Sequence, residues 1–207
     1  MTDLAFLVTA FTTMFVVIDP PGQAPLFVAL TQDMDPATRR KVAIRACATA
    51  AGVLAMFAAF GEALLGFVGI SMPAFRVAGG VLLFLTAMDM LFERRTKRRE
   101  SSAEEEEHVD PSVFPLGIPL IAGPGSIATV ILLAGQHPGI EGLATVILVM
   151  LAVIAVVLAL YLASELLARL LGKTGINVVT RLLGMLLAAL AVQFILSGLH
   201  DFGIAGM

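Results

Sequence analysis

Six apolar segments run through the chain, and each is long enough to cross a lipid bilayer. A helical span needs roughly 20 apolar residues. Inside a bilayer every backbone polar group must be satisfied within the protein, which allows only helices and closed barrels. The Ala- and Leu-rich segments favour helices, and none alternates as a barrel strand does. The predicted spans cover residues 4–30, 42–68, 73–92, 113–134, 143–166 and 177–199.

Composition and charge support a membrane protein with a defined orientation. Charged residues make up 14% of the 207 residues, whereas about 25% of an ordinary soluble domain is charged. The basic residues gather at the first, third and fifth loops between spans, and loops 66–72 and 135–142 contain no Lys or Arg. By the positive-inside rule, we expect the odd-numbered loops in the cytoplasm. Both termini are then expected on the outer, periplasmic side of a bacterial inner membrane.

The first span is interrupted by an acid and three prolines, in the run Ile18-Asp19-Pro20-Pro21-Gly22-Gln23-Ala24-Pro25. Proline has no N–H to donate, and the residue before it avoids the helical region. An Asp at the centre of a membrane helix costs about 3 kcal/mol on an insertion scale. We therefore interpret this run as a broken helix and a candidate binding site, with a simple kink as the alternative.

Weak self-similarity relates the two halves of the chain. The matches are Pro21-Gly22 with Pro124-Gly125, Glu62 with Glu165, and Arg76-x-x-Gly79 with Arg181-x-x-Gly184. Each half holds three spans, an odd number, so the halves would cross the membrane in opposite directions, as in many transporters. We predict an all-α membrane protein of two inverted three-helix repeats, 1–92 and 113–207, with broken first and fourth helices and a charged cytoplasmic linker at 93–112. Convergent Ala, Leu and Gly content is the alternative explanation.

The matched charges within the spans are predicted to be structural. Glu62 and Arg76 lie at adjacent ends of the second and third spans, and Glu165 and Arg181 take the corresponding places in the second half. Charges within spans usually pair with one another. We expect two ion pairs that join neighbouring helices.

The second break, Gly123-Pro124-Gly125, is expected to lie opposite the first. A helix that restarts after a Pro-Gly pair offers N–H groups that attract anions, whereas Asp19 and the carbonyls freed by proline attract cations. Both characters together suit a zwitterion such as an amino acid, or an ion with a small polar solute. The candidate site residues are Asp19, Pro20, Pro21, Gly22, Gln23, Asp89, Gly123, Pro124, Gly125, Ser126, Thr129 and Gln193.

The sequence contains none of the common hydrolase, redox or nucleotide-binding motifs. His108 follows four glutamates in the linker, and such an acidic run is interpreted as solvated chain rather than a metal site. We therefore expect no enzyme and no resident metal or cofactor, although a coupling H⁺ or Na⁺ is compatible with Asp19.

At these residues the sequence resembles the MarC family of six-span bacterial inner-membrane proteins, also called the neutral amino acid transporter family. The motifs that carry the resemblance are Asp19-Pro20-Pro21-Gly22, Arg76-x-x-Gly79-Gly80 leading to Asp89-Met90-Leu91, Ile118-Pro119-Leu120-Ile121-Ala122-Gly123-Pro124-Gly125, and Arg181-x-x-Gly184 leading to Gln193-Phe194. The similarity covers nearly the whole chain outside the linker. It implies a multi-pass membrane protein in the wider class of small six-span exporters, some of which are described as moving small neutral amino acids.

The leading hypothesis is a secondary transporter, or exporter, of small neutral amino acids or similar zwitterions. Its partners would be the lipid bilayer and a small-molecule substrate, with no nucleic acid, and its small-residue spans permit a homo-oligomer. The rival hypothesis is a non-transporting membrane scaffold or regulatory protein. In that case the charged linker would bind a partner, and the broken helices would serve only for packing.

Overall fold

The structure is a computed structural model that describes residues 4–31, 34–92 and 111–203, so the linker with His108 lies outside the described residues. The described residues form helices and no strand. In chain order these are α1 (Leu4–Ile18), α2 (Pro20–Thr31), α3 (Pro36–Val68), α4 (Met72–Leu91), η1 (Ser112–Ile121), α6 (Pro124–Gln136), α7 (Ile140–Leu162) and α8 (Ser164–Asp201). Five segments, with α1 and α2 counted as one, are long and apolar enough to cross a membrane. A sixth results if η1 and α6, bent by 55°, are counted together. The predicted all-helical membrane protein is confirmed.

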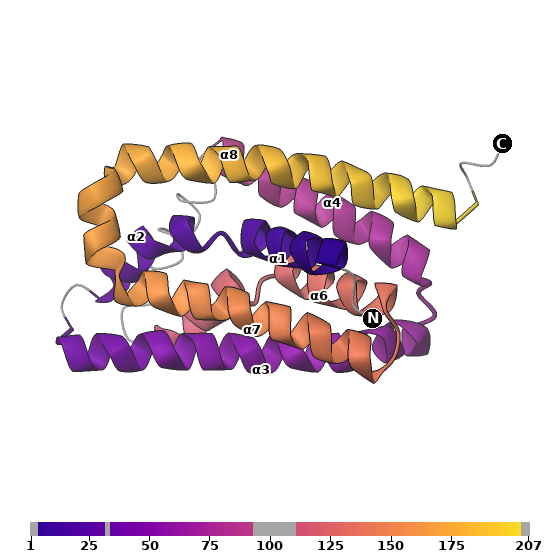
Figure 1. Ribbon diagram of the computed structural model, residues 1–207, viewed down its shortest axis with the longest axis horizontal. Helices are drawn as coiled ribbons and strands as arrows, with labels where there is room; N and C mark the ends of the chain where they lie inside the picture. Colours follow the sequence, from indigo (N-terminus) through magenta and orange to yellow (C-terminus); the bar gives the residue numbers. More distant parts are fainter. Residues whose placement is uncertain (1–3, 32–33, 93–110, 204–207) are drawn as a thin grey trace.

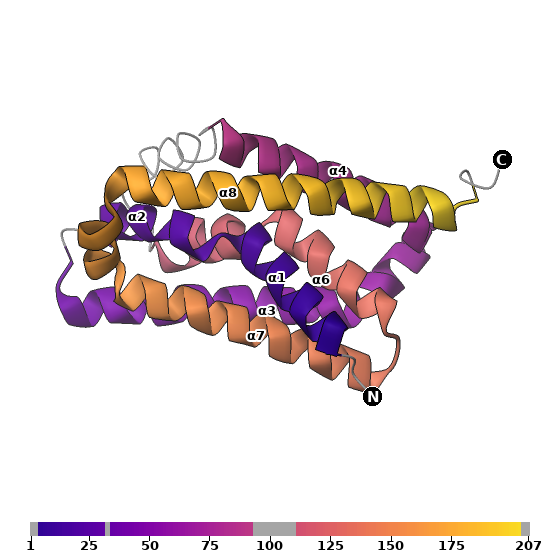
Figure 2. The same ribbon diagram turned by 45° about the horizontal axis from the view of Figure 1, so that its top comes forward.

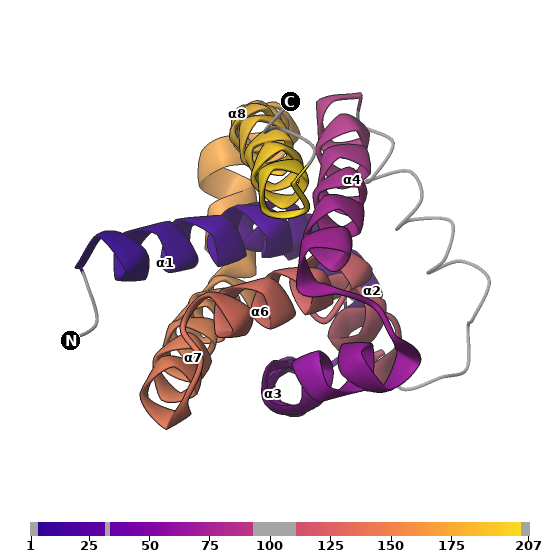
Figure 3. The same cartoon turned by 90° about the vertical axis from the view of Figure 1, so that its right-hand side faces the viewer.

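The helices form three layers, and the broken helices occupy the middle one. Figures 1 and 3 show α4 and α8 on one side, α3 and α7 on the other, and α1, α2 and α6 between them. Long helices therefore flank the two interrupted ones on both sides. This arrangement shields the polar backbone of the breaks from lipid, as a membrane protein requires.

The main packing contacts join the two predicted halves. Helix α3 packs against η1, α6 and α7, and α4 packs along α8, whereas α3 and α4 touch little. Glycines permit the close approach of α4 and α8. A Cβ on Gly80 would lie 2.8 Å from the carbonyl oxygen of Ala191, and one on Gly184 would lie 3.3 Å from that of Ala87. Each helix thus presents a glycine to the backbone of the other.

Helix α3 begins with a capped first turn. Asp35 caps α3 by accepting from the backbone N–H of Ala37 at 2.9 Å, and Pro36 occupies the first helical position, where its missing N–H is harmless. Asp35 is exposed. The hydrogen bond from the Thr38 side chain, and to a smaller extent the one from the Thr38 backbone, lower the pKa of Asp35 below the ordinary value of 3.8. The Asp35 carboxylate therefore stays charged at neutral pH. Helix α3 begins at residue 36, six residues before the apolar segment that was predicted to start at 42.

The second half departs from the predicted boundaries at its last two spans. Helix α7 ends at Leu162 rather than near 166, and α8 begins at Ser164 and bends at Gly172, where φ is 60° and ψ is 177°. Such a positive φ is open to glycine at little cost. The span proper is Thr174–Asp201, and Figure 2 shows the preceding turns crossing from the α7 layer to the α8 layer. The side chain of Glu165, predicted to pair with Arg181, is not among the side chains that the structure describes.

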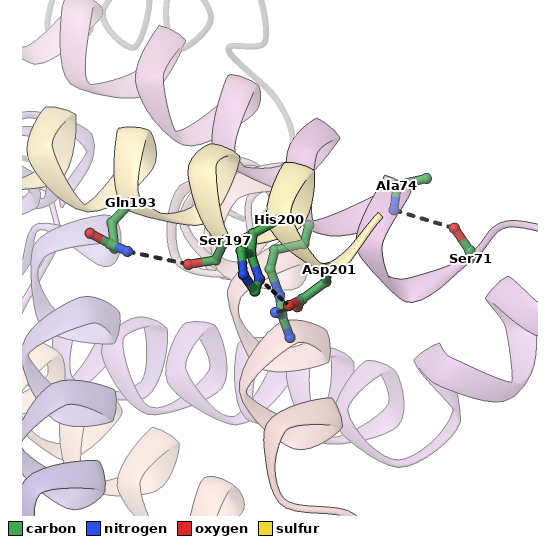
Figure 4. Close-up of polar contacts among 7 residues, drawn as sticks. Ser71, Ala74, Gln193, Ser197, His200 and Asp201 are labelled. Carbon is green, nitrogen blue, oxygen red and sulfur yellow. Dashed lines mark hydrogen bonds and ion pairs between the residues drawn. The ribbon is translucent and has the colours of Figure 1, made fainter. Parts of the chain in front are cut away.

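Both ends of the described chain lie near the turns that lack basic residues. The Phe6 ring of α1 lies against the His137 ring, with 4.1 Å between centroids, next to the α6–α7 turn. Asp201, at the end of α8 (Figure 4), accepts from Arg76 near the start of α4. The two ends of the described chain, at Leu4 and just after Asp201, therefore lie at one end of the molecule, which we call the neutral end. Arg39 and Arg40, at the start of α3, lie at the opposite end, called the basic end.

The predicted Glu62–Arg76 ion pair is wrong. Arg76 pairs with Asp201, and Glu62 is exposed on α3. The prediction assumed that consecutive spans pack as a hairpin. Here α3 and α4 lie in different layers, and α4 packs on α8 instead, which brings the last residues of α8 to Arg76.

Candidate functional site

The first break is a single residue, Asp19, with a buried side chain. Its φ is 58°, in the left-handed region, and none of its surface is exposed. This conformation is uncommon outside glycine, although Asp and Asn tolerate it better than most residues. Asp19 Oδ1 accepts from the backbone N–H of Gly22 at 3.2 Å. Gly22 is required there, because a Cβ would overlap the Asp19 carboxylate.

The new helix begins earlier than the sequence analysis expected. Helix α2 starts at Pro20, directly after Asp19, rather than after Gly22. The Gln23 N–H therefore donates within the helix, to the Asp19 carbonyl at 3.2 Å. The two prolines fill the first positions of α2, where no N–H is needed. The expected anion-attracting N–H of Gln23 is thus already used.

Ser126 closes the second break with its side chain. Ser126 Oγ accepts from the Gly123 N–H at 2.9 Å and donates to the carbonyl of Ile121 at 2.6 Å. Thr129 Oγ1 donates to the Gly125 carbonyl at 2.8 Å. Here too an N–H near the start of the new helix is already used, since that of Ile127 donates to the Gly123 carbonyl at 2.9 Å. Both hydroxyls predicted for the site are therefore hydrogen-bonded to backbone and buried.

The two breaks meet in the middle layer. Gln23 Nε2 donates to the carbonyl of Ile18 at 2.5 Å and to that of Leu120, in η1, at 3.2 Å. One amide thus joins the first break to the segment that leads into the second. A Cβ on Gly125 would lie 3.2 Å from Cγ1 of Val17 in α1, so the second Pro-Gly pair packs directly on the first broken helix.

Tyr161, which the sequence analysis did not single out, completes this network. It is the only tyrosine in the chain, it is 1% exposed near the end of α7, and its hydroxyl donates to Gln23 Oε1 at 2.6 Å. Its ring stacks on Phe27 of α2, with 4.4 Å between centroids and 8° between planes. The sequence did contain a signal for this contact. A buried tyrosine hydroxyl usually needs a hydrogen-bond partner, and Tyr161 lies alone in an otherwise apolar helix.

Two further predicted site residues, Gln193 and Asp89, lie on the outer-layer helices α8 and α4. Gln193 is exposed on α8 and donates to Ser197 on the same helix at 3.3 Å (Figure 4). Asp89 is half-buried near the end of α4. The polar side chains of the breaks, by contrast, are buried: Asp19, Gln23, Ser126 and Thr129 are all at most 2% exposed. Pro21 and Gly22 are half-buried, and Pro124 is exposed. The structure thus brings together the two Pro-Gly motifs and leaves Gln193 outside.

Similarity to known proteins fits this architecture. Residues 4–202 match the family described as "MarC family integral membrane protein". The chain belongs to the MarC family. The "UPF0056 membrane protein YvbG" of Bacillus subtilis is 38% identical over 199 residues, which is 94% of each chain. A "UPF0056 membrane protein" of Archaeoglobus fulgidus is 37% identical over 96% of this chain and 94% of its own.

A third MarC-family relative bears on location. The "UPF0056 inner membrane protein YhgN" of Escherichia coli K12 is 32% identical over 194 residues, 94% of this chain and 96% of its own. No solved structure matches this chain. The resemblance deduced from the Asp19 and Gly123 motifs is therefore confirmed at the level of the family, and the protein is an integral, multi-pass membrane protein.

Proposed function

We propose that this MarC-family protein is a secondary transporter of small neutral amino acids or similar zwitterions across the inner membrane, with the paired breaks as its substrate site. The observation that carries the proposal is the double hydrogen bond of Gln23, which donates to Ile18 at one break and to Leu120 beside the other. Broken helices at matching places are where transporters of inverted-repeat design bind their substrates. A buried acid, Asp19, lies at the same point.

The proposal includes an inverted repeat of two three-helix units. Cross-packing supports it: α3 packs on η1 and α6, while α7 packs on α1 and α2. Each second helix thus covers the broken helix of the other half, and the two third helices, α4 and α8, pack on each other. A twofold axis in the membrane plane would produce this reciprocal packing of the two halves.

In this proposal Asp19 binds the coupling cation, H⁺ or Na⁺, or the substrate ammonium. We assign the closed break to the occluded state of this transporter, and the burial of Asp19, Gln23 and Ser126 supports that assignment. Substrate entry requires α1 and α2 to move relative to η1 and α6, so that Gln23 releases Leu120. The basic residues of the first loop support a cytoplasmic location for the basic end.

Flux through vesicles tests the proposal directly. Purified protein is reconstituted in proteoliposomes, and uptake and efflux of labelled glycine and L-alanine are measured with and without imposed H⁺ and Na⁺ gradients. Saturable flux above that of protein-free vesicles supports transport. The absence of flux in both directions under every gradient would favour the scaffold hypothesis, in which loss of residues 95–107 abolishes partner binding.

A further inference from the structure

A pocket at the basic end lies directly behind the Gln23 network. It has a volume of about 260 Å³, and it is lined by Phe27, Pro36, Arg39, Arg40, Tyr161 and Leu162. This volume is near the lower limit of about 300 Å³ for ordinary ligand sites, so the pocket suits a small molecule. It is formed by the end of α2, the start of α3 and the end of α7.

Arginine side chains give the pocket a positive wall. Arg39 Nε donates to Thr31 Oγ1 at 3.2 Å, and its guanidinium carbon lies 5.9 Å from the centre of the Phe27 ring. These two contacts hold the guanidinium over the aromatic floor. A guanidinium is a planar fork of donors that matches a carboxylate. Arg40 also lines the pocket, so two guanidinium-bearing side chains form this wall.

The floor of the pocket separates it from the breaks. It consists of the stacked rings of Phe27 and Tyr161, each 1% exposed. Behind the rings, the Tyr161 hydroxyl donates to Gln23, whose amide donates to Ile18 beside Asp19. One side chain therefore contacts both the pocket and the network that closes the first break.

We infer that this pocket is the cytoplasmic capture site of the transported zwitterion, where Arg39 and Arg40 bind its carboxylate above the Phe27–Tyr161 pair. This inference rests on the proposed transport function and names the chemistry by which the substrate is first recognised. A carboxylate held there lies against Tyr161, and movement of that ring would break its hydrogen bond with Gln23. The pocket and the Asp19 break are then successive positions on one route.

The intrinsic fluorescence of the protein tests the inference without a label. The chain has one tyrosine and no tryptophan, so its tyrosine emission comes from Tyr161 alone, at the floor of the pocket. The purified full-length protein in neutral detergent is titrated with L-alanine, with L-alaninamide, which lacks the carboxylate, and with inorganic phosphate. We expect a saturable change with L-alanine and none with L-alaninamide.

Two variants of the same helix supply the matched comparison. Arg39→Gln removes one charge from the pocket wall, whereas Lys41→Gln removes one charge from an exposed position outside it. Because a hydrogen bond to a charged group is lost, Arg39→Gln should weaken L-alanine binding about tenfold or more. Lys41→Gln should bind as the wild type does. Unchanged elution on size-exclusion chromatography confirms that both variants are folded.

Three results would overturn the inference. They are a wild-type emission that L-alanine does not change, an Arg39→Gln variant that titrates like the wild type, and a response to phosphate but not to L-alanine. Flux through vesicles, measured in parallel, separates the two proposals. Flux without any Tyr161 response removes the capture site and leaves transport standing. A carboxylate-specific, Arg39-dependent response without flux supports the site and counts against transport.

Discussion

Gln23 and Ser126 make the same kind of hydrogen bond at matching positions of the two Pro-Gly motifs. Each follows the glycine of its motif, and each donates from its side chain to the carbonyl of an isoleucine five residues earlier, Ile18 or Ile121. The second break, however, is completed by Ser126 without any acid, since the same hydroxyl also accepts from the Gly123 N–H. A neutral side chain is therefore sufficient to close such a break, and the charge of Asp19 is not needed for that purpose.

Replacing Asp19 by Asn isolates this charge. Asn can accept from the Gly22 N–H as Asp19 Oδ1 does, and it tolerates the positive φ of 58°. We expect Asp19→Asn to fold with near wild-type thermal stability and to lose most labelled L-alanine flux in proteoliposomes, because the group that binds the cation or ammonium is neutralised. A variant that transports like the wild type would show that Asp19 serves only as a cap.

The first break was predictable because its causes are local. The prolines of the Asp19 motif act through covalent geometry, by removing N–H groups and restricting the preceding residue, and these effects are visible in sequence. Which residues then meet depends on how the layers pack. Tyr161 lies far along the chain from Gln23, and no pattern within α7 specifies its partner. The Arg76 pair was misassigned for the same reason, since hairpin packing of α3 on α4 was assumed.

The fit between Gly22 and Asp19 can be tested with alanine. In Gly22→Ala the new Cβ would overlap the Asp19 carboxylate, which must rotate away and give up its bond to the Gly22 N–H. Overpacking of this kind destabilises by about 1–3 kcal/mol, so a lower melting temperature in detergent is expected. The matched control is Gly52→Ala in α3, where a Cβ meets nothing within 4 Å. Helix propensity should make that variant more stable, by up to about 1 kcal/mol. Equal shifts in the two variants would contradict the proposed fit.

The bond between Tyr161 and Gln23 should be detectable as a coupling energy. Tyr161→Phe keeps the stack on Phe27 and leaves Gln23 Oε1 buried without this donor, which costs about 1–3 kcal/mol. Gln23→Met removes the acceptor and, with it, the bonds to Ile18 and Leu120. If the bond forms, the double variant should be more stable than the sum of the single losses implies, by about 0.5–3 kcal/mol. Urea or thermal unfolding of the four proteins measures this difference, and strict additivity would argue against the contact.

The pairing of Arg76 distinguishes the observed packing from the hairpin that sequence suggested. The Arg76 side chain is 15% exposed and that of Asp201 is 43% exposed, so the pair belongs to the partly solvated class whose members contribute about 0.2–1 kcal/mol. Asp201→Asn should lower the thermal stability by an amount in this range, with a larger effect at low salt, because screening weakens the pair. Glu62→Gln removes an exposed acid from α3 and should leave stability within experimental error. Destabilisation by Glu62→Gln with none by Asp201→Asn would restore the α3–α4 hairpin and contradict the layer arrangement in which α4 packs on α8.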